Sequence, residues 1–285
     1  MQHCLRTAIH PVRTPAILCS RSIPTLRRLA LAKLKHSDWP ARLWIVRHGQ
    51  SAGNVARDAA ELSGAALIDL DSRDANTPLS ELGHEQSTIL GRWFASLPAD
   101  QRPQVLLCSP FVRAQQTCEA IAMAIAIDPE EVAVDERLRE KEFSVLDRYT
   151  VAGIRAKFPE LAEQRAMVGK FYFRPPGGES WCDVILRLRS VVEVLRRDYV
   201  GERVVIVGHQ VIVNCFRYLL ECMDEETILR IDREGDVPNC SVTEFGFVGV
   251  GDEARFGLIQ ANFVVPMEDT GVPVTKAPDR PAGPK

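Results

Sequence analysis

Three short apolar runs, each ending in a polar cluster, divide the chain into repeated units of strand and helix. The runs are 43–46, 105–108 and 204–207. Unbroken apolar runs of this length are typical of strands buried on both faces of a parallel sheet. Between them lie longer segments with apolar residues at helical spacing. This order predicts a three-layer α/β/α sandwich around a largely parallel central sheet.

Local signals place the helices and the later strands. Ser80 has the hydroxyl of a helix N-cap, ahead of a helix that we expect to reach Leu97. Residues 149–200 read as mostly helical, with a Pro-Gly loop at 174–180, and we interpret this stretch as a cap insertion over the strand ends. Further helices are expected at 51–62, 113–127 and 211–220, and late strands at 242–248 and 254–263.

The two ends of the chain differ from the domain expected at 42–265. Residues 1–42 hold eight Lys or Arg and one acid, Asp38. An Arg-rich segment with few acids is typical of an organelle transit peptide, and a disordered extension is the alternative for residues 1–41. Residues 266–285 are rich in Pro, Gly, Thr and Lys, so we expect a disordered tail there.

Composition restricts the partners. The net charge of −3 gives no electrostatic reason to expect a nucleic acid or a membrane surface. No apolar run approaches the ~18 residues of a membrane-spanning helix. The eight cysteines form no CxxC pair, which indicates a reducing compartment. We therefore expect a cytoplasmic protein, or an organellar one if residues 1–41 are a transit peptide. The sequence does not indicate an oligomeric state.

The chemistry is concentrated at the three strand ends. Arg47 and His48 follow the first strand, Ser109 and Arg113 follow the second, and His209 follows the third. In an open α/β sheet, ligands bind outside the carboxyl ends of the strands. Further polar residues at the same places are candidate substrate contacts. They are Gln50, Ser51, Asn54 and Gln210.

Two Arg and two His meeting in one crevice predict a site for a dianion such as a phosphate monoester. Arg suits this role because its planar fork can bind two phosphate oxygens at once. The sequence has no HExxH metal motif and no P-loop, so we expect neither a metal nor a cofactor. The predicted partner is a small phosphorylated molecule.

Phosphoryl transfer needs a nucleophile, charge stabilisation and a proton for the leaving oxygen. A neutral imidazole at His48 can attack phosphorus, while His209 donates to the phosphoryl oxygens. Glu140 is the candidate acid if burial raises its pKa, and Glu142 is the alternative.

Six sequence blocks, in this order, resemble the histidine phosphatase superfamily, the phosphoglycerate-mutase-like proteins. They are 47–51 with Asn54, 78–83, Ser109-Pro110 with 113–117, 138–140, 176–180 and Gly208-His209. The resemblance implies a phosphohistidine on His48, with phosphate bound by Arg47, Asn54, Arg113 and His209. It also implies that Glu140 is the proton donor and that no cofactor is needed.

The chain departs from the family pattern near Glu140. Ser144 and Arg148 stand where the family often has glycine, which leaves the conformation of this loop open. The mutase branch usually has Glu-Arg-His-Tyr-Gly around the acid, and Glu140-Lys141-Glu142-Phe143-Ser144 lacks it. We therefore favour a phosphatase over a mutase, with a non-catalytic phosphate-binding protein as a third alternative.

The cap is expected to select the substrate. Its aromatic residues are candidates for the pocket wall, and Arg174 is a candidate for binding a second anionic group. The aromatic candidates are Phe158, Phe171, Tyr172, Phe173 and Trp181.

Overall fold

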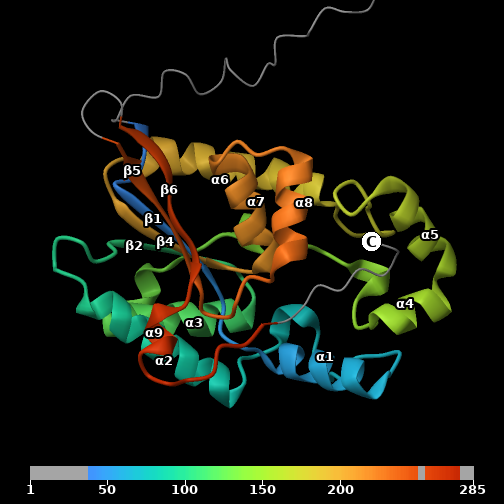
Figure 1. The fold of residues 1–285 in the computed structure, drawn as a ribbon. Coiled ribbons are helices and arrows are strands. Elements are labelled where there is room, and N and C mark those ends of the chain that lie inside the picture. Colours follow the sequence, from blue (N-terminus) through green and yellow to red (C-terminus); the bar gives the residue numbers. More distant parts are fainter. Residues whose placement is uncertain (1–37, 250–253, 277–285) are drawn as a thin grey trace, which may run out of the picture. The chain divides into compact units, whose positions relative to one another are not determined.

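A six-stranded sheet lies at the centre of the residues that the computed structural model describes, 38–249 and 254–276. Its strands are β1 (Arg42–Arg47), β2 (Val105–Cys108), β3 (Ala133–Val134), β4 (Arg203–Gly208), β5 (Val242–Val248) and β6 (Arg255–Phe263). They lie in the order β3-β2-β4-β1-β5-β6 (Figure 1). The pairs β3–β2, β2–β4 and β4–β1 are parallel, whereas β5 and β6 are antiparallel additions at one side. The sheet is therefore largely parallel, as predicted.

The helices connect these strands. They are α1 (Ala52–Ser63), α2 (Glu81–Ser96), α3 (Val112–Ala124), α4 (Val151–Lys157), α5 (Pro159–Val168), α6 (Trp181–Asp198), α7 (Gln210–Leu220), α8 (Glu225–Glu234) and α9 (Val265–Glu268). Short 3₁₀ helices occupy η3 (Asp74–Asn76), η4 (Pro129–Glu131), η5 (Glu136–Leu138) and η6 (Ser144–Leu146). The predicted cap of α2 is confirmed, because the Ser80 hydroxyl accepts a hydrogen bond from the Gly83 N–H.

The alternation of side chains along each strand separates the core into two layers. Leu43 and Ile45 of β1 pack in one cluster with α6, α7 and α8. Trp44 and Val46 point to the other face and pack with α2, α3 and α9. Figure 1 shows these two groups of helices on opposite sides of the sheet. The three-layer α/β/α sandwich predicted from the sequence is confirmed.

The cap is shorter than the sequence suggested. We expected an insertion at about 149–200, but Leu188 and Leu195 of α6 are completely buried in the same cluster as Ile45 and Ile206. α6 is therefore one of the helices that cover the sheet. By contrast, α1, α4 and α5 contribute no residue to either cluster and lie together at one end of the sheet (Figure 1). The insertion proper is α4 and α5, and α8 is a helix that the sequence analysis did not predict.

Both expected domain boundaries were placed too close to the sheet. Trp39 is buried and stacks on Phe256, with ring centroids 4.6 Å apart, so the domain begins before residue 42. At the other end, the chain continues along the domain beyond residue 265, where we expected disorder. Thr275 donates to the Asn239 side chain, and the Gln86 amide donates to the Pro273 carbonyl. Residues 1–37 and 277–285, the rest of both terminal predictions, lie outside the described residues.

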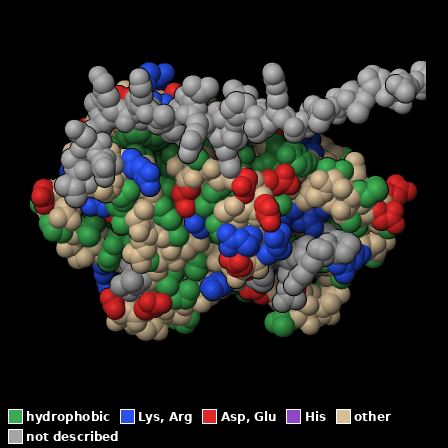
Figure 2. All heavy atoms as spheres, turned by 45° about the horizontal axis from the view of Figure 1, so that its top comes forward, with side chains coloured by type: hydrophobic (Ala, Val, Ile, Leu, Met, Phe, Trp, Pro, Cys, Tyr) green, Lys and Arg blue, Asp and Glu red, His purple; other side chains and the backbone are tan. Residues whose placement is uncertain are grey.

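The surface is mixed in character. On the face that Figure 2 presents, basic, acidic and apolar side chains are interspersed. Within residues 38–249 and 254–276, no helix is both long and apolar enough to cross a membrane.

Candidate active site

The carboxyl ends of β2, β4 and β1 lie next to one another in the sheet. The register pairs Arg47 with Gly208 and Cys108 with Val207. Residues that follow these strands therefore lie close together although they are far apart in the sequence, as His48 and His209 are. The rings of His48 and His209 lie 5.1 Å apart, centroid to centroid. The strand order of the sheet therefore brings the three strand ends together, as predicted.

A pocket opens at this edge, and most of the predicted site residues line it. They are Arg47, His48, Ser51, Asn54, Arg113, Glu140 and Gln210. His209 is completely buried and lies behind this lining, in edge contact with His48. Gln50 is the one candidate that lies elsewhere, since its side chain accepts a hydrogen bond from Ser80.

The hydrogen bonds of His48 fix which ring nitrogen carries the proton. Nδ1 lies 2.6 Å from the Gly49 carbonyl oxygen, which can only accept, so Nδ1 is protonated. Nε2 accepts from Nε of Arg113 at 3.2 Å and therefore presents its lone pair. Burial, together with Arg113 and Arg47, lowers the pKa of His48 well below its usual value. His48 is thus a neutral imidazole with a nucleophilic Nε2.

His209 is positioned by Ser109. Its Nε2 lies 2.7 Å from the Ser109 hydroxyl, and that oxygen accepts from the Phe111 N–H, so the hydroxyl can donate to Nε2. The ring proton then belongs on Nδ1, which is buried and has no partner among the described residues. Burial, Arg113 and His48 lower the pKa of His209 as well, so it is a neutral donor.

The two arginines supply the positive charge. Arg47 donates to the carbonyl of Val237, while its Nε is buried without a partner among the described residues. Burial lowers the pKa of Arg47 to about 10, so it remains protonated at neutral pH. Arg113 donates to the Asp74 carbonyl at 2.6 Å and forms an ion pair with the Asp74 carboxylate at 3.1 Å. Asp74 therefore holds the Arg113 fork beside His48.

Asn54 is oriented by hydrogen bonds to its oxygen. Its Oδ1 accepts from the Ser51 N–H at 3.0 Å and from Nδ2 of Asn239 at 3.3 Å. Both lone-pair directions of the oxygen are used inside the protein, which leaves the two N–H groups of Nδ2 for a ligand. Asn239 also donates to the His48 carbonyl at 3.0 Å. One buried amide thus positions both the backbone of His48 and the side-chain amide of Asn54.

The structure separates the two candidate acids. Glu140 lines the pocket and accepts from the Lys141 N–H at 2.8 Å. Burial raises the pKa of its carboxyl, against the opposing effects of that hydrogen bond and of Arg113. Glu142 is exposed, lies outside the pocket and accepts from the Ser144 N–H. Only Glu140 has the location and the environment of a proton donor.

Ser51 and Gln210 line the pocket with their side chains committed to other groups. Ser51 caps α1, in a capping box with Asn54. Gln210 donates to Asp236 at 3.1 Å, and its Oε1 is buried with no partner among the described residues. Ser51 therefore acts through Asn54, whereas Gln210 can still accept from a ligand.

Other matched blocks support the site from outside the pocket. A Cβ on Gly83 would lie 1.9 Å from the Gln50 carbonyl oxygen, so the start of α2 can approach the His48 loop only with glycine at 83. Glu179 forms ion pairs with Arg139 and Arg187 and accepts from the Glu142 N–H. These bonds fasten the loop that carries Glu140 to α6.

The loop after Glu140 keeps a glycine-like backbone without glycine. Ser144 and Arg148, at the two positions where the family often has glycine, have φ of 48° and 65°. Few non-glycine residues adopt the left-handed region, and those that do are often found at functional sites. The two residues that depart from the family pattern therefore adopt a backbone conformation that glycine adopts readily.

Sequence reasoning missed several residues of this site, including three that bear on its chemistry. Arg57 of α1 and Asp74 of η3 line the pocket, and Asn239 lies just beneath it. Arg57 falls one helical turn after Asn54, so its position on the same face of α1 could have been inferred. Asp74 begins the short 3₁₀ helix η3 and Asn239 lies in a loop, and no local pattern distinguishes them from other polar residues nearby.

Of the aromatic residues proposed for the pocket wall, only some line a pocket. Phe173 and Trp181 line a second pocket beside the first, whereas Phe171 belongs to the core and Tyr172 is exposed. Phe158 packs on Tyr149, with ring centroids 5.1 Å apart. Arg174 forms an ion pair with Asp183 and lines neither pocket.

The fold and the site together define an α/β protein with a pocket in which two arginines lie beside a neutral histidine. Comparison with protein families agrees, because residues 43–255 match the model of the histidine phosphatase superfamily, branch 1. That match covers most of the chain. The protein therefore belongs to the histidine phosphatase superfamily.

Individual relatives include both mutases and phosphatases. A 2,3-bisphosphoglycerate-dependent phosphoglycerate mutase of Sinorhizobium fredii is 29% identical over 199 residues, 69% of this chain and 87% of that protein. A 6-phosphofructo-2-kinase/fructose-2,6-bisphosphatase of Caenorhabditis elegans is 28% identical over 62% of this chain, but only 33% of that enzyme is covered. The α-ribazole phosphatase of Shigella flexneri has the same fold, with a TM-score of 0.60, 21% identity and coverage of 78% of this chain and 96% of that one.

Proposed function

We propose that this protein hydrolyses phosphate monoesters without a metal ion, through a phosphohistidine formed on His48. The observation that carries the proposal is the state of that ring: Nδ1 donates to Gly49, and Nε2 lies unprotonated in the pocket, where its lone pair accepts from Nε of Arg113. A buried imidazole of lowered pKa remains neutral, and therefore nucleophilic, over the physiological pH range.

Unsatisfied donors around His48 support a phosphoryl ligand. Nε of Arg47 and Nδ1 of His209 are both buried without a partner among the described residues. A buried donor without a partner costs about 1–3 kcal/mol, and phosphoryl oxygens can accept from both. Together with Arg113 and the oriented amide of Asn54, they are the donors that we assign to the phosphoryl oxygens.

The reaction has two transfers. In the first, the lone pair on His48 Nε2 forms a bond to phosphorus while the bond from phosphorus to the ester oxygen breaks, and Glu140 gives its proton to that oxygen. In the second, water attacks the phosphohistidine, Glu140 takes a proton from this water, and the bond between phosphorus and nitrogen breaks. The products are an alcohol and inorganic phosphate, and both His48 and Glu140 return to their starting states.

A phosphoglycerate mutase is the second candidate, supported by the relative in S. fredii. A mutase returns the phosphoryl group to the substrate and must exclude water. We favour hydrolysis because the residues after Glu140, Lys141-Glu142-Phe143-Ser144, lack the Arg-His-Tyr-Gly that is usual in the mutase branch. Phosphoglycerate interconversion, assayed with bisphosphoglycerate as primer, discriminates between the two.

The first test is phosphate release from p-nitrophenyl phosphate and a panel of small phosphate esters in EDTA. We expect His48→Ala to lose at least about 10³-fold in kcat/KM, since the nucleophile is removed. His84→Ala, which changes an exposed histidine of α2, is the matched control and should retain full activity. Equal activity of His48→Ala and His84→Ala would overturn the proposal, and release that needs added metal would contradict its mechanism. No release by the wild type would leave the mutase or a non-catalytic phosphate-binding protein.

A further inference from the structure

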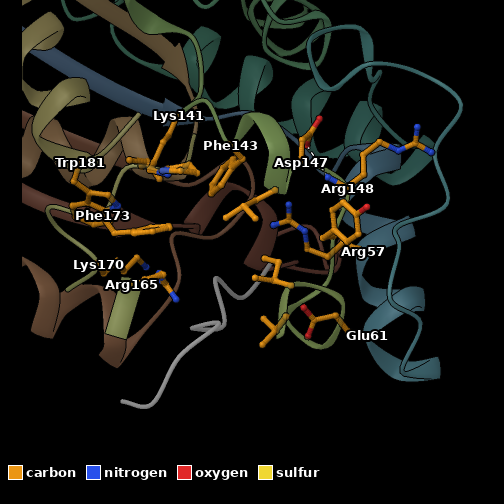
Figure 3. Close-up of a pocket in the computed structure, with 16 residues that line it drawn as sticks. Arg57, Glu61, Lys141, Phe143, Asp147, Arg148, Arg165, Lys170, Phe173 and Trp181 are labelled. Carbon is orange, nitrogen blue, oxygen red and sulfur yellow. Dashed lines mark hydrogen bonds between the residues drawn. The ribbon is translucent and has the colours of Figure 1, made fainter. Parts of the chain in front are cut away.

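A second pocket continues from the phosphate pocket. Arg57, Phe143, Asp147, Arg148 and Val211 line both, so the two share a wall. In Figure 3, Phe143 lies between two ends of this second pocket. One end carries Phe173, Trp181, Lys170 and Arg165, and the other carries Arg57, Asp147, Arg148 and Glu61. A substrate with its phosphoryl group at His48 can therefore extend its alcohol part past Phe143.

The second pocket joins an apolar surface to an excess of positive charge. Phe173 and Trp181 are buried side chains of its wall, and Leu146 adds an aliphatic surface. Five basic residues line it against two acids, Glu61 and Asp147, although the whole chain carries a net charge of −3. The basic residues are Arg57, Lys141, Arg148, Arg165 and Lys170. This local excess is opposite in sign to the protein as a whole.

The basic side chains differ in whether they already interact with other residues of the protein. Lys170 forms an ion pair with Asp232 at 2.6 Å, and Lys141 lies 4.1 Å from the centre of the Phe143 ring. Among the described residues, no side-chain hydrogen bond or ion pair holds the guanidinium of Arg57 or of Arg165. Both side chains are only partly exposed. Arg57 and Arg165 are therefore the two partly buried arginines of this pocket whose N–H groups can still donate to a ligand.

The positions of these arginines give them different roles. Arg57 lines both pockets and can reach either the phosphoryl group or the start of the alcohol part. Arg165, in the last turn of α5, lines only the second pocket and lies at the end with Phe173 and Trp181 (Figure 3). Both acids of the pocket lie at the opposite end. A negative group beyond Phe143 would therefore meet Arg165 away from both acids that line the pocket, while Asp232, behind the lining at this end, is paired with Lys170.

We propose that the second pocket selects phosphate esters whose alcohol part has an apolar ring or face and carries a second negative charge, which Arg165 binds. This inference rests on the proposed phosphatase function and adds the class of substrate. A guanidinium recognises a carboxylate or a phosphate through two parallel hydrogen bonds, and an aromatic wall packs on the apolar part of the same ligand.

The test uses matched pairs of aryl phosphates. Each pair has a carboxylate and the corresponding neutral carboxamide at the same place: 3-carboxyphenyl, 4-carboxyphenyl and 4-(carboxymethyl)phenyl phosphate with their amides. The measured quantity is the ratio of kcat/KM for acid over amide, compared between protein variants. The comparison between variants removes the intrinsic difference in reactivity between the two esters of a pair.

We expect the wild type to prefer the acid in at least one pair and Arg165→Gln to lower that ratio about tenfold, the effect of one charge-assisted hydrogen bond. The activity of Arg165→Gln on the amide should stay within about twofold of the wild type. Arg57→Gln should lower kcat/KM for both members of a pair. Arg174→Gln is the matched control, because Arg174 lies near the same cap but outside both pockets. Arg165→Lys, which keeps the charge, should retain part of the preference.

Two results would overturn this inference while leaving the phosphatase proposal intact: no preference for the acid in any pair, or an equal acid-to-amide ratio in wild type and Arg165→Gln. If no ester releases phosphate, the proposed function fails instead. The substrate class is then tested by binding, since a ligand that binds the folded state raises the Tm. The acid esters must raise the Tm of the wild type more than the amides do, and Arg165→Gln must lose this difference, or the inference is wrong.

Discussion

Replacing Ser144 with glycine should make the protein more stable. Ser144 has a φ of 48°, in the left-handed region that costs a residue with a Cβ about 1–2 kcal/mol. Its side chain forms no hydrogen bond with the residues that the structure describes, and its backbone N–H would still donate to Glu142. Glycine also lowers the free energy of unfolding by about 0.4–1 kcal/mol, because it increases the entropy of the unfolded chain. The net effect is a gain of about 0.8 kcal/mol in the free energy of unfolding.

The neighbouring residue supplies the control. Val145 is exposed and does not have a positive φ, so glycine there relieves no strain. Val145→Gly should lower the free energy of unfolding by about 0.4–1 kcal/mol through the unfolded chain alone.

Urea denaturation measures the free energies of unfolding, and thermal denaturation should show Ser144→Gly melting about 2 °C above the wild type. Since the backbone of the loop does not change, kcat/KM should stay within about twofold. If Ser144→Gly is destabilised as much as Val145→Gly, the left-handed conformation carries no strain, and the reasoning from φ is refuted.

Two further predictions concern the chemistry of the site. The reaction needs neutral His48 and protonated Glu140, so kcat/KM should fall at acid pH only below the lowered pKa of His48 and should fall again as the pH rises through the raised pKa of Glu140. In Glu140→Gln, kcat/KM should no longer fall at high pH. This variant should also hydrolyse alkyl phosphates far more slowly, but p-nitrophenyl phosphate less so, because that leaving group needs little protonation. A normal pH profile in Glu140→Gln together with an altered one in Glu142→Gln would reverse the assignment. Asn239→Ala should cost about 2 kcal/mol in urea denaturation, because the His48 carbonyl and Asn54 Oδ1 each lose a donor. It should also raise KM by releasing the Asn54 amide, and unchanged kinetics would show that Asn239 does not position the site.

The pattern along the chain was sufficient for the architecture. Period-3.6 helices alternating with fully apolar strands leave few arrangements other than helices on both faces of a parallel sheet. The same pattern could not distinguish a helix that covers the sheet from a helix of the cap. α6 is amphipathic either way, and only its packing against Ile45 and Ile206 decides the matter.

The main residues of the site could be predicted from the sequence, but their protonation states could not. Arg47, His48, Arg113 and His209 were identifiable because they lie at the end of a strand or within a few residues after it, and neighbouring parallel strands end at the same edge. Their protonation was not identifiable. The neutrality of both imidazoles results from burial and from nearby arginines, and the proton position on His48 results from one backbone carbonyl.

The sequence by itself determined the fold class, the family and the residues at the strand ends, since these depend on local periodicity and on short motifs. Only the tertiary structure decided that Glu140 and not Glu142 faces the pocket, that Asp74 and Asn239 position Arg113 and Asn54, and that a second pocket with Arg165 adjoins the first. The physical reason is that loop conformation and burial depend on contacts between residues far apart in the chain. No local pattern of residues encodes those contacts.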